Sequence, residues 1–186
     1  MNTKDKLTYQ IGRIPRSLID KPTTFIGGDN NRFIINKILN QLLEKSTVEE
    51  LEVVSLLKDG YETIDVDEQY INNTALNTIL DNRYDYVIEH NFFSIKHEML
   101  ERGVSYFPSI ILLIDNSYDV NHISELLMDA PKLGIFVFYL ANEEDTLAKS
   151  REFIASFSQT ILTKEDDKKH VSVEIYDMKY RLEINK

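Results

Sequence analysis

The sequence predicts a three-layer α/β fold with a mainly parallel central sheet and a C-terminal β-hairpin. Short apolar runs alternate along the chain with longer segments whose apolar residues recur at helical spacing, which is the pattern of βαβ units. Several of the short runs are apolar throughout, as expected for strands that helices cover on both faces of a sheet. The chain has 186 residues, 42% of them apolar, so we expect one domain over residues 1–186 with a substantial core.

The expected elements follow one another in a regular order. The strands are short apolar or β-branched runs, and they lie at residues 23–26, 51–57, 109–114, 134–140 and 160–162. The helices have apolar residues near a 3.6-residue period, and they lie at residues 31–44, 73–102, 122–128 and 146–157. Asp59-Gly60 closes the second strand, and Gly103 lies where the long second helix needs a C-terminal cap. Alternating runs at residues 171–175 and 180–184 predict the terminal hairpin over residues 171–184.

The composition excludes several classes of function. The chain carries 31 acidic and 21 basic residues, a net charge of −10, so we expect no nucleic-acid partner and no binding to an anionic membrane surface. Cysteine is absent, which excludes disulfides, thiolate metal sites and cysteine nucleophiles. The longest apolar run, residues 133–141, is much shorter than the about 20 residues of a transmembrane helix. The N-terminus has no apolar signal-peptide region, and we expect a cytoplasmic location.

Histidines do not predict a metal site. His90 and His97 lie seven residues apart on the expected long helix, which separates them by about 10 Å. One metal ion cannot bridge that distance, so we expect solvated or hydrogen-bonded histidines and no metal.

The turn after the first strand has the layout of a phosphate-binding loop. A working loop reads G-x-x-x-x-G-K-[ST], in which backbone N–H groups and the Lys bind phosphates and the hydroxyl binds Mg²⁺. The turn from Gly27 to Arg32 contains no Lys, Ser or Thr, and Asp29 adds negative charge where a triphosphate needs positive charge. On this segment alone, an ordinary strand-to-helix turn with Asp29 or Asn30 as N-cap is the simpler interpretation.

Taken together, residues 14–184 resemble the FtsK/SpoIIIE-type P-loop ATPase family. Residues 14–22 resemble the lead-in that these domains carry in type VII secretion ATPases, and residues 36–43 resemble the helix after their Walker A loop. Residues 109–115 resemble the Walker B strand, and residues 133–142 resemble the next strand and its sensor loop. The order and spacing of these segments, more than any single motif, carry the resemblance.

The resemblance implies a P-loop NTPase-like fold whose nucleotide site departs from the family's pattern. Asn31 and Arg32 stand at the positions of the Lys and Ser/Thr, in a loop about two residues short. Asp115 keeps the Walker B aspartate, but Asn116 replaces the catalytic Glu, and Glu143 reverses the charge of the sensor loop. We therefore expect no catalytic residue and no cofactor, although ATP-Mg²⁺ is the family's ligand. The expected vestigial nucleotide site consists of Gly27, Gly28, Asn31, Arg32, Asp115, Asn116 and Glu143.

The implied function is that of a C-terminal, non-hydrolysing domain of an EssC-type type VII secretion ATPase. On this resemblance the chain is an excised cytoplasmic piece of a membrane-anchored parent, with residues 1–22 as its lead-in. Its expected partners are secreted WXG100-type helical substrates and neighbouring ATPase domains of the same chain. Two alternatives stay open: a switch that binds ATP or ADP without hydrolysis, which the retained Asp115 favours, and a DNA-translocating ATPase, which the charge of −10 disfavours.

A partner-binding surface is expected on the long helix. Tyr86, Phe93 and Leu100 are spaced by sevens and have charged neighbours, which suits the docking of a helical substrate segment. The alternative is that all three side chains lie in the core.

Overall fold

A computed structural model describes residues 3–57, 69–102, 105–118, 120–167, 169–176 and 178–184. The strands are β1 (Thr8–Ile11), β2 (Ile14–Ser17), β3 (Thr23–Gly27), β4 (Leu51–Ser55), β5 (Gln69–Tyr70), β6 (Ser109–Ile114), β7 (Ile135–Ala141), β8 (Gln159–Asp167), β9 (His170–Ile175) and β10 (Met178–Glu183). The α-helices are α1 (Thr3–Lys6), α2 (Asn31–Leu43), α3 (Asn73–Glu89), α4 (Ile95–Arg102), α5 (Ile123–Asp129), α6 (Glu143–Ala148) and α7 (Arg151–Ala155). Short 3₁₀ turns, η1 (Val120–His122) and η2 (Ala130–Leu133), flank α5.

An 8-stranded sheet forms the centre of the molecule, in the order β10-β9-β8-β3-β7-β6-β4-β5. The strands from β8 to β5 run parallel, whereas β9 and β10 are antiparallel additions at one edge. This confirms the predicted α/β class, the mainly parallel sheet and the C-terminal hairpin. The first strand of the alternating pattern, β3, lies between two strands that come much later in the chain, β7 and β8.

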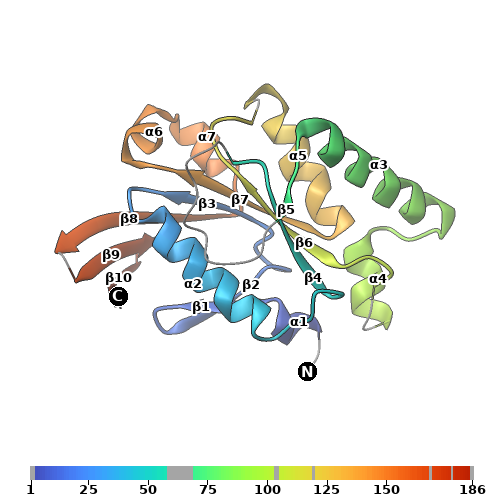
Figure 1. Ribbon diagram of the computed structural model, residues 1–186, viewed down its shortest axis with the longest axis horizontal. Coiled ribbons are helices and arrows are strands. Elements are labelled where there is room, and N and C mark those ends of the chain that lie inside the picture. The colour runs from blue at the N-terminus through green and yellow to red at the C-terminus, as the bar shows by residue number, and fades with distance from the viewer. Residues whose placement is uncertain are drawn as a thin grey trace.

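Helices cover both faces of the sheet. Figure 1 shows α2 and the β1–β2 hairpin on one side, and α3 and α5 on the other. Neighbouring residues of β7 point to opposite faces: Phe138 meets the ring of Tyr9 at 6.4 Å, while Tyr139 stacks on Phe25 at 5.6 Å. All residues of β6 and β7 are buried, as their uninterrupted apolar sequences predicted.

The long helix expected over residues 73–102 is wrong, because the chain forms two helices there. α3 ends at Glu89 and α4 begins at Ile95, and between them Asn91 has a φ of 56°, in the left-handed region that stops a helix. His90 and His97 therefore do not share one helix. The expected capping residue, Gly103, lies outside the described residues, as does Asp59-Gly60.

The helix expected over residues 146–157 is also divided. α6 ends at Ala148, and Ser150 begins α7 as its N-cap by accepting a hydrogen bond from the N–H of Phe153 at 3.1 Å. In the described parts of the chain, no helix is both long enough and apolar enough to cross a bilayer.

The hairpin of β1 and β2 was not predicted. It packs Tyr9 and Ile11 into the core, and its turn at Gly12 lies against the ring of Tyr180 on β10. Gly12 has a φ of +67°, and a Cβ at this position would lie 2.3 Å from Tyr180 Cδ1. The start of the chain is thereby joined to its last strand.

Tyr9 makes the stability of the fold depend on pH in the alkaline range. The side chain is buried, its hydroxyl oxygen accepts a hydrogen bond from Gln159 Nε2 at 2.6 Å, and burial raises the pKa of Tyr9 to about 12. In the unfolded chain the pKa is about 10, so the native state keeps a proton that the unfolded state loses. This contribution to stability is complete below pH 10 and lost as pH rises from 10 through 12, by about 3 kcal/mol in total.

Urea unfolding across this pH range checks the prediction. We expect Tyr9→Phe to flatten the alkaline fall in the free energy of unfolding, although it also leaves Gln159 without its acceptor. The exposed Tyr84 provides the control, and Tyr84→Phe should keep the full pH dependence. Equal slopes for the wild type and Tyr9→Phe would contradict the assignment.

Candidate functional site

The predicted nucleotide-site residues gather where parallel strands end. Gly27 and Gly28 lie at the carboxyl end of β3, Asp115 and Asn116 follow β6, and Glu143 begins α6 directly after β7. These three strands are neighbours in the sheet, so their ends lie at one edge. Ligands of open α/β sheets bind at such edges.

The glycine turn is engaged by the protein's own groups. The Gly28 N–H donates to Ala141 O at 2.9 Å and lies 3.2 Å from Thr146 Oγ1. Thr163 Oγ1 donates to Gly27 O at 3.0 Å. Both hydroxyls come from other elements, α6 and β8, so this turn is tied to its surroundings on two sides.

The two glycines have a structural reason that the sequence analysis missed. Gly28 has a φ of +103°, and a Cβ there would lie 2.1 Å from Thr163 O. A Cβ on Gly27 would lie 2.7 Å from Thr146 Oγ1. The pair lets β8 and α6 approach the end of β3 closely, a requirement independent of any phosphate. Nothing in the local sequence marks either threonine as its partner.

The connection from β3 to α2 is very short. Gly28, Asp29 and Asn30 join the two elements, and α2 begins at Asn31. Asn30 occupies the N-cap position, as the simpler interpretation of the turn expected, but its side chain makes no capping hydrogen bond. Asn31 is buried, and Arg32 is half-buried in the first turn of α2.

Asp115 is buried at the end of β6. Its Oδ1 accepts the N–H of Ser117 at 2.8 Å, and Ser117 Oγ donates to Leu56 O at 3.0 Å. The loop after β6 is thereby fastened to the loop after β4. The carboxylate that resembles a Walker B aspartate thus takes part in a turn of its own loop.

Several further acidic groups at this edge accept hydrogen bonds from neighbouring elements. Asp29 Oδ1 accepts the N–H of Glu143 at 3.1 Å, which links the glycine turn to α6. Asn116 Nδ2 donates to Asp145 Oδ1 at 3.0 Å, which links the loop after β6 to the same helix. Asp29 and Asp145 therefore each have a donor, and Glu143, Glu144 and Asp145 lie in the first turn of α6, where the helix N-terminus favours negative charge.

Two pockets open at this edge. One, of about 390 Å³, is bordered by Gly27, Gly28 and Glu143 together with parts of α6 and β8–β10. The other, of about 430 Å³, is shallow and bordered by acidic residues; it is lined by Asp29, Asn142, Glu143, Glu144 and Leu147. Within the described ranges, no three His, Asp or Glu side chains gather closely enough to hold a metal ion.

The predicted partner surface is not one face of a helix. Tyr86 belongs to α3, whereas Phe93 lies in the connection to α4 with 88% of its surface exposed. The Tyr86 hydroxyl donates to Glu98 Oε1 at 2.8 Å, and its ring stacks on Tyr106 at 5.1 Å. The side chain of Leu100 lies outside the described part of the structure. The three residues therefore do not lie along one helix, and the alternative that all three are core is wrong because Phe93 is exposed.

The fold is similar to that of a solved type VII secretion ATPase and a solved conjugation coupling protein. The cytoplasmic domain of the type VII secretion ATPase EccC of Thermomonospora curvata matches with a TM-score of 0.68 and 12% identity, over 98% of this chain and 29% of that chain. The pCW3 conjugation coupling protein TcpA, solved with ATPγS, matches with a TM-score of 0.63 and 14% identity, over 92% of this chain and 62% of that chain.

A further structure bears on peptide binding. ATPases 2 and 3 of Thermomonospora curvata EccC, in complex with a signal sequence peptide, match with a TM-score of 0.53 and 14% identity, over 82% of this chain and 32% of that chain. No family model and no curated protein matches the sequence. At these identities the comparisons show that the chain shares the α/β fold of these proteins, and the chain spans less than a third of the EccC structures it matches.

Proposed function

We propose that the chain is a non-hydrolysing ATPase-like domain of a type VII secretion motor, and that it recognises substrates or couples their binding to neighbouring ATPase domains. The observation that carries the proposal is that the glycine turn is held by the protein's own groups and lacks a Lys. Its glycines contact Ala141, Thr146 and Thr163, and its sequence supplies no Lys.

The residues present do not fit ATP-Mg²⁺. Phosphoryl transfer depends on positioned positive charge and metal ligands. At the described edge the Gly28 N–H already has protein acceptors, and Asp29 and Glu143 carry negative charge beside the turn; the Lys residues of the adjoining pocket, Lys164 and Lys179, come from the terminal strands and not from the turn. Asn116 cannot act as the base that positions an attacking water.

Protein partners are the expected ligands. A signal sequence peptide binds ATPases 2 and 3 of the EccC structure, which has the same fold as this chain. We propose by analogy that secreted WXG100-type helical proteins bind this domain, on the cytoplasmic side of a membrane-anchored parent. Neighbouring ATPase domains of that parent are the second proposed partner.

Nucleotide titration tests the first half of the proposal. We expect isothermal titration with ATP-Mg²⁺ to show no saturable heat below millimolar concentration, and we expect no phosphate release above background. Asn31→Lys, which returns a Lys to the turn, should still give no hydrolysis because Asn116 and Glu143 remain. Hydrolysis by the wild type would overturn the proposal, and hydrolysis by Asn31→Lys would contradict the interpretation of Asn116 and Glu143.

The nucleotide-binding switch remains a second candidate because Asp115 is retained and the TcpA structure was solved with ATPγS. Saturable binding of ATP without hydrolysis in the same titration would favour it.

A further inference from the structure

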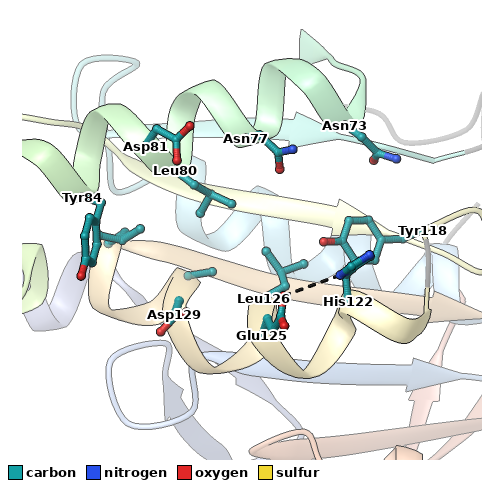
Figure 2. Close-up of a pocket in the computed structure, with 12 residues that line it drawn as sticks. Asn73, Asn77, Leu80, Asp81, Tyr84, Tyr118, His122, Glu125, Leu126 and Asp129 are labelled. Carbon is teal, nitrogen blue, oxygen red and sulfur yellow. Dashed lines mark ion pairs between the residues drawn. The ribbon is translucent and has the colours of Figure 1, made fainter.

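A groove separates α3 from α5 on the face of the sheet opposite α2. It has a volume of about 560 Å³. Figure 2 shows side chains of the two helices facing each other across it. Its lining residues are Asn73, Asn77, Leu80, Asp81, Tyr84, Tyr118, His122, Glu125, Leu126, Asp129, Ala130 and Leu133. None of these belongs to the predicted nucleotide site.

The floor of the groove is apolar. Leu126 and Leu133 are almost fully buried, and Leu80 is half-buried between the helices. On α3 the apolar side continues beyond the floor, because Tyr84 and Ile88 follow Leu80 at four-residue spacing and are 59% and 57% exposed. A stripe of this kind is suited to contact with another apolar surface.

The rim of the groove is acidic. Asp81 lies on the α3 side, and Glu125 and Asp129 lie on the α5 side. None of the described residues that line the groove is a Lys or Arg. Glu125 pairs with His122 at 3.6 Å and Asp129 pairs with Lys132 at 2.8 Å, but these pairs are exposed and contribute little. The rim therefore attracts positive charge.

We propose that this groove binds a helical peptide segment with an apolar ridge flanked by Lys or Arg. The apolar ridge would lie on Leu80, Tyr84 and Leu126, and the basic flanks would face Asp81 and Glu125. From Asn73 to Tyr84, α3 extends about 17 Å, which accommodates about three helical turns of the ligand. This inference deepens the proposed function, since it identifies the surface and the chemistry by which a helical substrate is recognised.

A matched pair of peptides tests the proposal on the full chain without nucleotide. The probe is a fluorescein-labelled amphipathic helix of about four turns, with Leu at i, i+3, i+4 and i+7 and Lys on both flanks. The control peptide has the same Leu residues and Glu in place of Lys. We expect fluorescence anisotropy to show at least about tenfold tighter binding of the Lys peptide, weakening as salt is raised.

Charge-reversal variants locate the binding. Asp81→Lys combined with Glu125→Lys should weaken binding of the Lys peptide by about tenfold or more and strengthen binding of the Glu peptide. Glu44→Lys is the control, because Glu44 is exposed at the end of α2, on the other side of the sheet. Circular dichroism should show the same folded spectrum for all of them.

Two serine substitutions separate this groove from the surface expected from the sequence. Tyr84→Ser should weaken peptide binding, and Phe93→Ser should leave it unchanged. Loss of binding with Phe93→Ser alone, equal binding of the two peptides, or equal effects of Glu44→Lys and the double reversal would each overturn the proposal. So would a dimer in solution that the groove variants dissociate, since a second copy would then occupy the groove. Hydrolysis of ATP would refute the non-hydrolysing function without changing any of these results.

Discussion

Gly28→Ala is expected to lower the free energy of unfolding by about 4 kcal/mol. The residue has a φ of +103°, which a side chain disfavours, and the new Cβ would lie 2.1 Å from the backbone oxygen of Thr163. Strain and overpacking therefore add, and the backbone of β8 has to move to relieve them. Urea denaturation followed by circular dichroism measures the loss.

Gly27→Ala provides the matched control. Its Cβ would meet Thr146 Oγ1 at 2.7 Å and Phe25 Cε1 at 2.9 Å, and side chains can give way where a backbone cannot. We expect a loss of about 1 to 2 kcal/mol, of which Thr146→Ala restores a part in the double variant, because the contact with Phe25 remains. By contrast, Thr163→Ala should not rescue Gly28→Ala, because the close oxygen belongs to the main chain. A full rescue would show that the backbone contact does not govern the cost.

Arg83→Ala is expected to cost about 3 to 5 kcal/mol, because this buried guanidinium joins three segments. From α3, its Nη1 donates to Leu133 O at 2.8 Å and its Nη2 donates to Pro108 O at 2.7 Å. Its guanidinium carbon lies 5.0 Å from the centre of the Phe107 ring. Burial lowers the pKa of Arg83 to about 10, against a weaker opposite effect of Glu52. Truncation would leave two carbonyls unpaired beside a cavity.

Thermal and urea unfolding of three variants isolate this role. Arg83→Lys keeps the charge but lacks the planar fork that reaches both carbonyls, so it should recover less than half of the loss. Arg151→Ala removes an exposed arginine from α7 and should change stability by less than about 0.5 kcal/mol. If Arg83→Ala lowered stability as little as Arg151→Ala, the contacts of Arg83 would contribute nothing to the stability of the fold.

The parallel strands were predictable because each is a short, almost uninterrupted apolar run. Residues 109–114 are apolar at almost every position, and a run this short and apolar indicates a strand covered on both faces. The break between α3 and α4 was not predictable in the same way. Asn91 adopts the left-handed conformation that ends α3, and Asn is second only to Gly in favouring it, but one Asn is a weak signal and the apolar period continues through it. The small hairpin of β1 and β2 was missed because its strands are short and contain Arg16 and Pro15.

Part of the candidate site was predictable from the sequence, and part was not. The order of segments placed Gly27, Gly28, Asp115, Asn116 and Glu143 at one edge of the sheet, since strand ends in a parallel sheet share an edge. The groups that these residues contact could not be predicted, because they come from segments that are distant in the sequence. The groove between α3 and α5 was missed because its two walls come from helices separated in the chain, each of which has an ordinary amphipathic sequence.

The position of β3 has a consequence for how the chain acquires its structure. β3 ends at residue 27, but its partners in the sheet begin at residues 135 and 159. On the ribosome, this strand therefore stays unpaired until β7 and β8 have been synthesised, more than 100 residues later. Loop closure over such separations makes folding slow, and during that interval the apolar edge of β3 is open to chaperones and to other nascent chains.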